Sequence, residues 1–157
     1  MNTRRNGINF VLADASYLPF KEATFDIVYS FGTIEHSKRT FHCIKESFRV
    51  LKHGGQVTHT VPNMFSLHSI LARPLLVGLK RWKLGLEKSF TIAQFYRMLK
   101  RSGFVNIAYD YLHLNPKLVT VKTYSSPRIV FLFNNLDNFI ANIVPLWGFF
   151  IAMSGFR

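Results

Sequence analysis

Two neighbouring residues with acid–base chemistry, Glu35 and His36, stand together in a chain that has few acidic groups. A histidine titrates near neutral pH, so His36 could remove a proton from a substrate as a general base. The alternative is that His36 lies at a helix start and makes a structural hydrogen bond. His59, in a strand-like stretch, is expected to be a core histidine bonded to the backbone. Both interpretations of His36 stay open at this point.

The other histidines and the single cysteine do not form the pattern of a metal site. We find no metal-ligand spacing among His42, His53, His68 and His113, and we therefore predict no metal. One cysteine excludes an intramolecular disulfide framework and a Cys-rich zinc module. Low cysteine use favours a reducing compartment, which leads us to expect a cytoplasmic location.

The charge balance is strongly basic, with 20 Lys and Arg against 8 Asp and Glu in 157 residues, a net charge of +12. Such an excess favours an anionic partner without identifying it. The apolar share of 48% is too high for a disordered basic tail, and the length suits one domain. Outside one stretch at residues 66–86, we expect the basic residues to be scattered and solvated.

The elements that position these residues begin with two short apolar runs, at 8–13 and 25–29. Continuous runs of this kind are typical of strands that are covered on both faces of a parallel sheet. Apolar residues at helical spacing predict a helix over about 39–52, and a third strand is expected at 56–61. This early alternation of strand and helix favours a layered α/β fold.

In the second half, Thr91 and Gln94 form a plausible capping box for a helix that runs to about Arg101 and ends at Gly103. A strand is expected at 104–114, an amphipathic helix over about 132–144, and a last strand at 147–153. The uncharged segment 138–156 could be read as membrane-spanning, but its Asn, Pro and Gly residues favour the helix followed by a strand.

Four blocks of sequence, in their order and spacing, carry a family resemblance: FVLADASYLPF (10–20), FDIVYSFGTIEH (25–36), ESFRVLKHGG (46–55) and EKSFTIAQFYRMLKRSGF (87–104). They resemble the class I S-adenosylmethionine-dependent methyltransferases, specifically the type 11 methyltransferase domain. The resemblance implies an α/β fold, a partial Rossmann-like methyltransferase domain, with a mostly parallel sheet that ends in an antiparallel strand.

The family also has sequence motifs that this chain does not match. The family's glycine-rich turn after its first strand, and the acidic residue that binds the ribose, have no counterpart here. We therefore expect an N-terminally truncated domain, 1–157, that lacks the first two strand–helix units. Because the family's first strand is central in its sheet, the strands at 8–13 and 25–29 would lose their usual neighbours.

By the resemblance, the cofactor is S-adenosylmethionine. Asp14 would accept a hydrogen bond from the adenine amine, and the backbone of Ala15 would face the ring; the alternative is that Asp14 only caps a turn. Ser30, Phe31 and Gly32 would line the methionine end of the cofactor, although Ser30 could be merely a polar strand end. His36 would lie at the mouth of the active site.

An insertion at about 62–90 lies where family members place a substrate cap. Its apolar and basic residues would suit a small-molecule or lipid-linked methyl acceptor, or an anionic membrane surface, and the alternative is a lid that packs on its own domain. No Asn-Pro-Pro-Tyr motif follows the second strand, so no nucleic acid is expected. The missing glycine motif leaves open whether the chain is active alone, or is a non-catalytic remnant, a binding subunit or a basic peripheral membrane protein.

Overall fold

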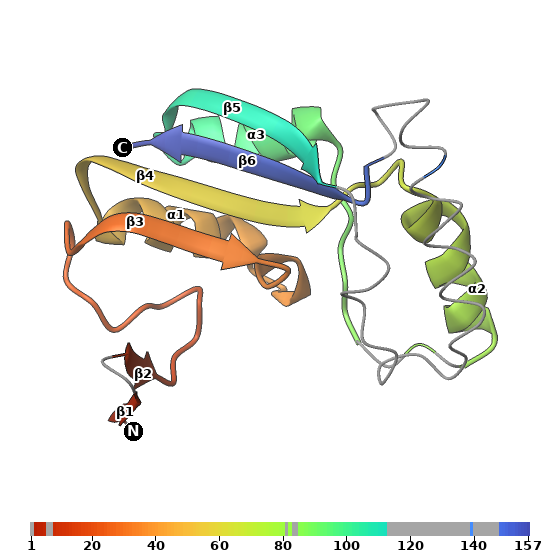
Figure 1. The fold of residues 1–157 in the computed structure, drawn as a ribbon, viewed down its shortest axis with the longest axis horizontal. Helices are drawn as coiled ribbons and strands as arrows, with labels where there is room; N and C mark the ends of the chain where they lie inside the picture. The colour runs from red at the N-terminus through yellow and green to blue at the C-terminus, as the bar shows by residue number, and fades with distance from the viewer. Residues whose placement is uncertain (1, 6–7, 81, 83–84, 113–138, 140–147) are drawn as a thin grey trace.

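A four-stranded sheet with two helices on one face forms the centre of the computed structural model (Figure 1), which describes residues 2–5, 8–80, 82, 85–112, 139 and 148–157. The sheet order is β3-β4-β6-β5, with the bounds β3 Phe25–Phe31, β4 Leu51–Pro62, β6 Phe150–Phe156 and β5 Val105–Leu112. β3 and β4 are parallel, and β6 is antiparallel to both β4 and β5. Three strands therefore share one direction and β6 opposes them, which confirms the expected sheet with an antiparallel last strand.

The strand register places one set of side chains on the covered face of the sheet. Val57 of β4 pairs with Gly155 of β6, and Val61 pairs with Ile151; Val57, Val61 and Ile151 are fully buried. Because side chains alternate between the two faces of a strand, these positions share the face on which the helices pack. The hydrophobic core lies in this layer.

Two helices cover that face, α1 Thr40–Val50 and α3 Ile92–Arg101. Ile44 of α1 and Phe95 and Leu99 of α3 have no exposed surface and pack in the same core cluster as the strand residues. The predicted capping box is confirmed, because the Thr91 hydroxyl accepts from the Gln94 backbone N–H and the Gln94 side chain accepts from the Thr91 N–H.

The N-terminal strands do not join this sheet. β1 Asn2–Arg5 pairs only with β2 Ile8–Val11, in an antiparallel two-stranded sheet that Figure 1 shows apart from the main one. The prediction that residues 8–13 form a buried strand is wrong, because Ile8 is 58% exposed and Leu12 is 89% exposed. An apolar run is buried only where other elements are present to cover it, and here no described element covers it.

The strand at the edge of the main sheet, β3, is covered on one face alone. Val28 is partly buried and packs against the hydrophobic core, whereas Ile27, Tyr29 and Phe31 are 68%, 61% and 50% exposed. The expectation that this run is covered on both faces is therefore also wrong. The expectation that it lacks a neighbour on one side agrees with its place at the edge of the described sheet.

The segment between β4 and α3 leaves the sheet and returns to nearly the same point. The backbone of Phe90 donates to Pro62 and accepts from Met64, both at 2.9 Å, so that the two ends of the segment are bonded together. Between these ends lie the π-helical turn η2 His68–Ala72 and the short helix α2 Arg73–Gly78. Figure 1 shows α2 beyond the end of β4, away from the sheet.

The remaining predicted elements differ from the structure mainly at their ends. The helix expected over 39–52 spans Thr40–Val50, and the last strand spans Phe150–Phe156 rather than 147–153. The strand expected from residue 56 begins at Leu51, since the backbone after α1 enters β4 directly. The predicted helix over 132–144 lies outside the described residues, apart from the single residue 139.

Candidate functional site

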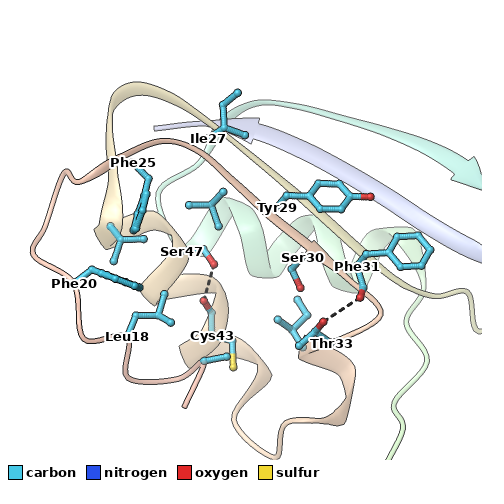
Figure 2. Close-up of a pocket in the computed structure, with 14 residues that line it drawn as sticks. Leu18, Phe20, Phe25, Ile27, Tyr29, Ser30, Phe31, Thr33, Cys43 and Ser47 are labelled. Carbon is cyan, nitrogen blue, oxygen red and sulfur yellow. Dashed lines mark hydrogen bonds between the residues drawn. The ribbon is translucent and has the colours of Figure 1, made fainter. Parts of the chain in front are cut away.

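A cavity of about 370 Å³ lies between β3, α1 and the loop that follows β2 (Figure 2). Its walls are mainly apolar, with Leu18 and Phe20 from the loop and Val50 from α1. Both faces of β3 contribute, Val28 from one and Ile27 from the other, so the cavity extends around the free edge of the strand. Its other end lies at the carboxyl end of β3, where open α/β sheets bind ligands.

The loop that carries Asp14 is held by hydrogen bonds of its own. One carboxylate oxygen of Asp14 accepts from both the backbone N–H and the hydroxyl of Ser16, each at 2.8 Å. These bonds, the backbone one first, hold the pKa of Asp14 below its ordinary value. In the structure, Asp14 therefore caps a turn, as the alternative interpretation expected. Ala15 lines the cavity, and contact of Asp14 with an adenine stays a prediction.

Two residues of α1 fasten the next part of this loop to the helix. Glu46 accepts from the Leu18 backbone N–H at 2.9 Å, and Arg49 donates to the carbonyl oxygens of Leu18 and Phe20 at 3.0 and 2.8 Å. Arg49 also pairs with Glu46 at 2.7 Å. This bonded pair fixes the loop wall of the cavity, and it is not apparent in the sequence because the partners are 28 to 31 residues apart.

The carboxyl end of β3 brings two of the predicted cofactor residues to the cavity. Ser30 and Phe31 both line it, and the buried Ser30 hydroxyl oxygen has no hydrogen-bond partner in the structure. A buried hydroxyl without a partner is costly, and a polar group of a ligand would relieve that cost. Among the described residues that line this cavity, the Ser30 hydroxyl is therefore the group best placed to form a hydrogen bond with a ligand.

Gly32 turns the chain out of β3 with a positive φ of +58°, a conformation that favours glycine. Its backbone N–H donates to the backbone oxygen and the hydroxyl of Thr60, each at 3.3 Å. Gly32 is not among the residues that line the cavity. Its structural role is to direct the chain into the short helix η1, Ile34–His36.

His36 is held by a backbone carbonyl of the segment between β4 and α3. Its Nδ1 lies 2.6 Å from the Leu86 carbonyl oxygen, which can only accept, so Nδ1 carries the proton and donates. Nε2 lies 3.8 Å from Oε1 of Glu35. His36 does not line the cavity, and this geometry is that of the structural hydrogen bond considered above. A catalytic role for His36 stays a prediction.

Two buried ionisable groups lie close to this region. Burial raises the pKa of Glu35 above its ordinary value, and its Oε2 has no hydrogen-bond partner. His59 is fully buried beside Phe95, with the ring centroids 6.4 Å apart, and burial lowers its pKa to about 4. The expectation of a core histidine is confirmed, but its backbone hydrogen bond is not, because neither ring nitrogen has a partner.

Helix α1 supplies a part of the cavity wall that was not predicted from the sequence. Cys43 and Ser47 line it, and the Ser47 hydroxyl donates back to the Cys43 carbonyl oxygen at 3.0 Å (Figure 2). Their spacing of four residues places them on one helix face, which is the sequence signal that could have found them.

Among the described residues, no three His, Cys, Asp or Glu come together as a metal site would require. In the same part of the chain, each helix is too short or too polar to span a membrane.

Residues 1–58 match the model of a methyltransferase domain family. Two relatives are the 27-O-demethylrifamycin SV methyltransferase of Amycolatopsis mediterranei, 38% identical over 48 residues, and the cycloartenol-C-24-methyltransferase of Arabidopsis thaliana, 46% identical over 46 residues. These matches cover 31% and 29% of this chain but only 18% and 14% of the relatives. The chain therefore spans a small part of the relatives it matches.

Solved structures match over nearly the whole chain. A methyltransferase of Thermotoga maritima, described as a possible histamine N-methyltransferase, has a TM-score of 0.63 and 18% identity, over 94% of this chain and 64% of that one. Phosphoethanolamine N-methyltransferase 2 of Haemonchus contortus, solved with S-adenosyl-L-methionine, has a TM-score of 0.59 and 18% identity, over 92% of this chain and 36% of that one. At this identity the likeness is one of fold.

Proposed function

We propose that this chain, which has the fold of class I S-adenosylmethionine-dependent methyltransferases and matches their domain family over its first 58 residues, forms one wall of a methyl-donor site. The observation that carries the proposal is the shared cavity of Ala15, Ser30 and Phe31, at the end of a strand that pairs in parallel with its neighbour. The reaction is methyl transfer to a small-molecule or lipid-linked acceptor.

The described residues fit S-adenosylmethionine in part. Leu18, Phe20 and Phe25 provide an apolar surface of the kind on which an aromatic ring packs, and Ser30 offers the unpartnered hydroxyl. Asp14 has one carboxylate oxygen engaged by Ser16, and a second is available in its exposed carboxylate for an amine. When bound, S-adenosylmethionine supplies an activated methyl group, so the task left to the chain is alignment.

The acceptor side of the proposal rests on the segment 62–90, which we infer to be a cap. The helices η2 and α2 and the C-cap residue of α2 leave large apolar side chains exposed: Ile70, Leu71, Leu75, Val77 and Leu79. Arg73 and Lys80 lie beside them in the sequence. Such a mixture would suit an acceptor with an apolar body, or a bilayer surface. The relatives' names specify acceptors of the small-molecule class, demethylrifamycin SV and cycloartenol.

The donor site is tested by isothermal titration of S-adenosylhomocysteine into the 157-residue chain. We expect weak but saturable binding, because one wall of a site is present. Ser30→Ala should weaken it roughly three- to tenfold through the lost hydrogen bond. The control is Ser154→Ala, whose hydroxyl bonds Thr58 at 2.8 Å outside the cavity and should leave the affinity unchanged. Absence of saturable binding would contradict the proposal for this chain.

A second function, that of a non-catalytic binding subunit, is favoured by the exposed edge and bare face of β3. Ile27, Tyr29 and Phe31 together present an apolar strip that protein partners commonly cover. One measurement, an assay of methyl transfer, distinguishes the two functions. Transfer of labelled methyl groups from S-adenosylmethionine to demethylrifamycin SV or cycloartenol by this chain alone would exclude the binding-subunit function, whereas cofactor binding without transfer would favour it.

A further inference from the structure

Two neighbouring cavities on the outer side of α1 and α3 are lined by basic side chains. Their volumes are about 370 and 550 Å³, and they share Lys88, Phe90 and Met98. The first lies at the start of α1, and the second lies against α3. We call this pair of cavities the cationic groove, defined by the basic residues Lys38, Arg39, His42, Lys88, Arg97 and Arg101.

No residue that lines either cavity is acidic. Within the described part of the chain, the ion pairs of carboxylates use other partners, namely His36, Arg49, Lys52, His68, Arg73 and Arg157. No described carboxylate forms an ion pair with these basic residues, although the charge of Arg39 contributes, after the hydrogen bonds from Ser16, to the lowered pKa of Asp14. Arg39 also donates to the Tyr17 hydroxyl at 3.0 Å. Like charges held within a Debye length of one another repel, and an anion that binds between them removes this repulsion.

The groove is a built feature with fixed walls. The Lys88 ammonium group donates to the carbonyl oxygens of Ser37 and Lys38 at 2.9 and 3.0 Å and contacts the Thr40 hydroxyl at 3.2 Å, which fixes the segment before α1. The Arg101 guanidinium lies 5.3 Å from the centroid of the Phe41 ring, and so bridges α3 to α1. Arg97 and Arg101 are four residues apart and share one face of α3.

The floor of the groove is apolar. Phe90 is 8% exposed, Met98 is partly buried, and both border the two cavities. A concave site of this volume, with an apolar floor and a few polar groups at its rim, has the character of a small-ligand site. Arginine pairs with phosphate and carboxylate oxygens in a bidentate manner, and the higher charge and additional oxygens of a phosphate group suit a site with several basic side chains.

We propose that the cationic groove binds a soluble organic phosphate, a phosphate ester whose apolar or aromatic body packs on Phe90 and Met98. The site is distinct from the proposed methyl-donor cavity. That cavity is bordered by Cys43, Ser47 and Val50 of α1, whereas the groove is bordered by the first turn of α1 and by α3. Binding there is independent of methyl transfer. The organic phosphate would be the anionic partner that the net positive charge of the chain favours.

The test is isothermal titration calorimetry. Phenyl phosphate, inorganic phosphate and phenol are each titrated into the full 157-residue chain at low and at moderate salt. We expect phenyl phosphate to bind more tightly than inorganic phosphate because of the apolar floor, and phenol to show no saturable binding. Arg97→Gln with Arg101→Gln should weaken phenyl phosphate binding roughly tenfold or more through the lost charge-assisted bonds. Both residues are exposed on α3, so the fold should persist.

The matched control is Lys45→Gln with Lys100→Gln, which removes the same charge from exposed positions of α1 and α3 that do not line the groove. This control should change the affinity by less than about twofold. Equal losses in both double variants, or no binding of phenyl phosphate to the unchanged chain, would overturn the proposal. Binding to phosphatidylglycerol vesicles without binding to phenyl phosphate would overturn it as well, since a bilayer surface would then be the ligand.

Discussion

The molecule has a closed region, formed by β4, β6, α1 and α3, and an open region, formed by β1, β2 and β3. Apolar strand residues are buried in the closed region and largely exposed in the open one. Val57 and Val61 in β4 are fully buried, whereas Ile8 and Phe10 in β2 are 58% and 50% exposed. Strand β4 has a hydrogen-bonded neighbour on each side and helices on one face, and β2 has only β1. Burial is therefore decided by what surrounds a strand, more than by its own residues.

The same comparison separates the two candidate ligand sites. The methyl-donor cavity extends around the free edge of β3, in the open region, and the Ser30 hydroxyl oxygen is its buried polar atom without a partner among the described residues. The cationic groove lies on α1 and α3, in the closed region, with its walls fixed by the bonds of Lys88. We therefore expect the groove to be preformed and the donor site to depend on further cover at the β3 edge.

The largest effect that distinguishes the two regions is expected from a pair of identical substitutions. Phe95→Ala removes a fully buried ring of α3 and should lower the free energy of unfolding by about 3–5 kcal/mol. Phe10→Ala, at a half-exposed ring of β2, should cost less than about 1 kcal/mol. Urea unfolding followed by circular dichroism measures both, and equal losses would show that the open region is packed as tightly as the closed one.

A pH-dependent loss of stability should come from His59 in the closed region. Its pKa of about 4 in the folded chain lies below the ordinary value of 6.5, so the unfolded chain binds more protons between these values. Stability should therefore fall as the pH drops from about 6.5 to about 4, by up to about 3 kcal/mol. The change is largest at the acid end of this window and absent above it.

Two variants isolate this histidine from the other groups that titrate in the same range. His59→Leu should flatten the difference in unfolding free energy between pH 7 and pH 4.5, because the protonation site is removed. His42→Gln, at an exposed position of α1, should leave the pH dependence as it is. If His59→Leu retained the full pH dependence, the assignment to His59 would be wrong.

The C-terminal residue Arg157 joins the closed region to the loop that leads into β3, and its loss should have an intermediate effect. Its guanidinium donates to the carbonyl oxygens of Arg49 and Leu51 at 2.7 and 2.6 Å, pairs with Glu22 and lies 5.0 Å from the centroid of the Phe48 ring. Arg157→Ala should cost about 2 kcal/mol of unfolding free energy, measured by urea titration.

Arg157→Lys is the control, since it keeps the charge but loses the planar fork that bonds several carbonyl oxygens. It should recover less than half of the lost stability. Full recovery with lysine would show that charge near the end of α1 matters more than the hydrogen-bond geometry.

The smallest effect concerns how the two helices begin. The Thr91 side chain caps α3, whereas Arg39 precedes α1 without a side-chain cap. Thr91→Ala should cost about 1 kcal/mol, and Arg39→Ala should cost a few tenths. Thermal unfolding in a calorimeter can resolve the two, and a larger loss at Arg39 would indicate that its contacts with Tyr17 stabilise the chain more than a cap does.

Local sequence signals predicted the elements whose structure depends on local chemistry. The Thr91–Gln94 capping box places the start of α3, and the apolar spacing of residues 41–51 places α1. The family resemblance named five cofactor residues; Ala15, Ser30 and Phe31 line one cavity, whereas Asp14 and Gly32 are not among its lining residues. Five of the 20 Lys and Arg residues line the groove together with His42, because positions 38–42, 88 and 97–101 meet only after the helices pack.

The sequence by itself determined the order β3, α1, β4, α3 and β5 and the cap of α3, because these elements depend on neighbours within a few positions. Only the tertiary structure decided that β2 leaves the sheet, that His36 bonds to Leu86, that Arg157 binds the end of α1, and that six basic side chains share one groove. Each of these depends on contacts between residues far apart in the chain. Whether a surface is covered is therefore set by the packing of whole elements, which local patterns do not encode.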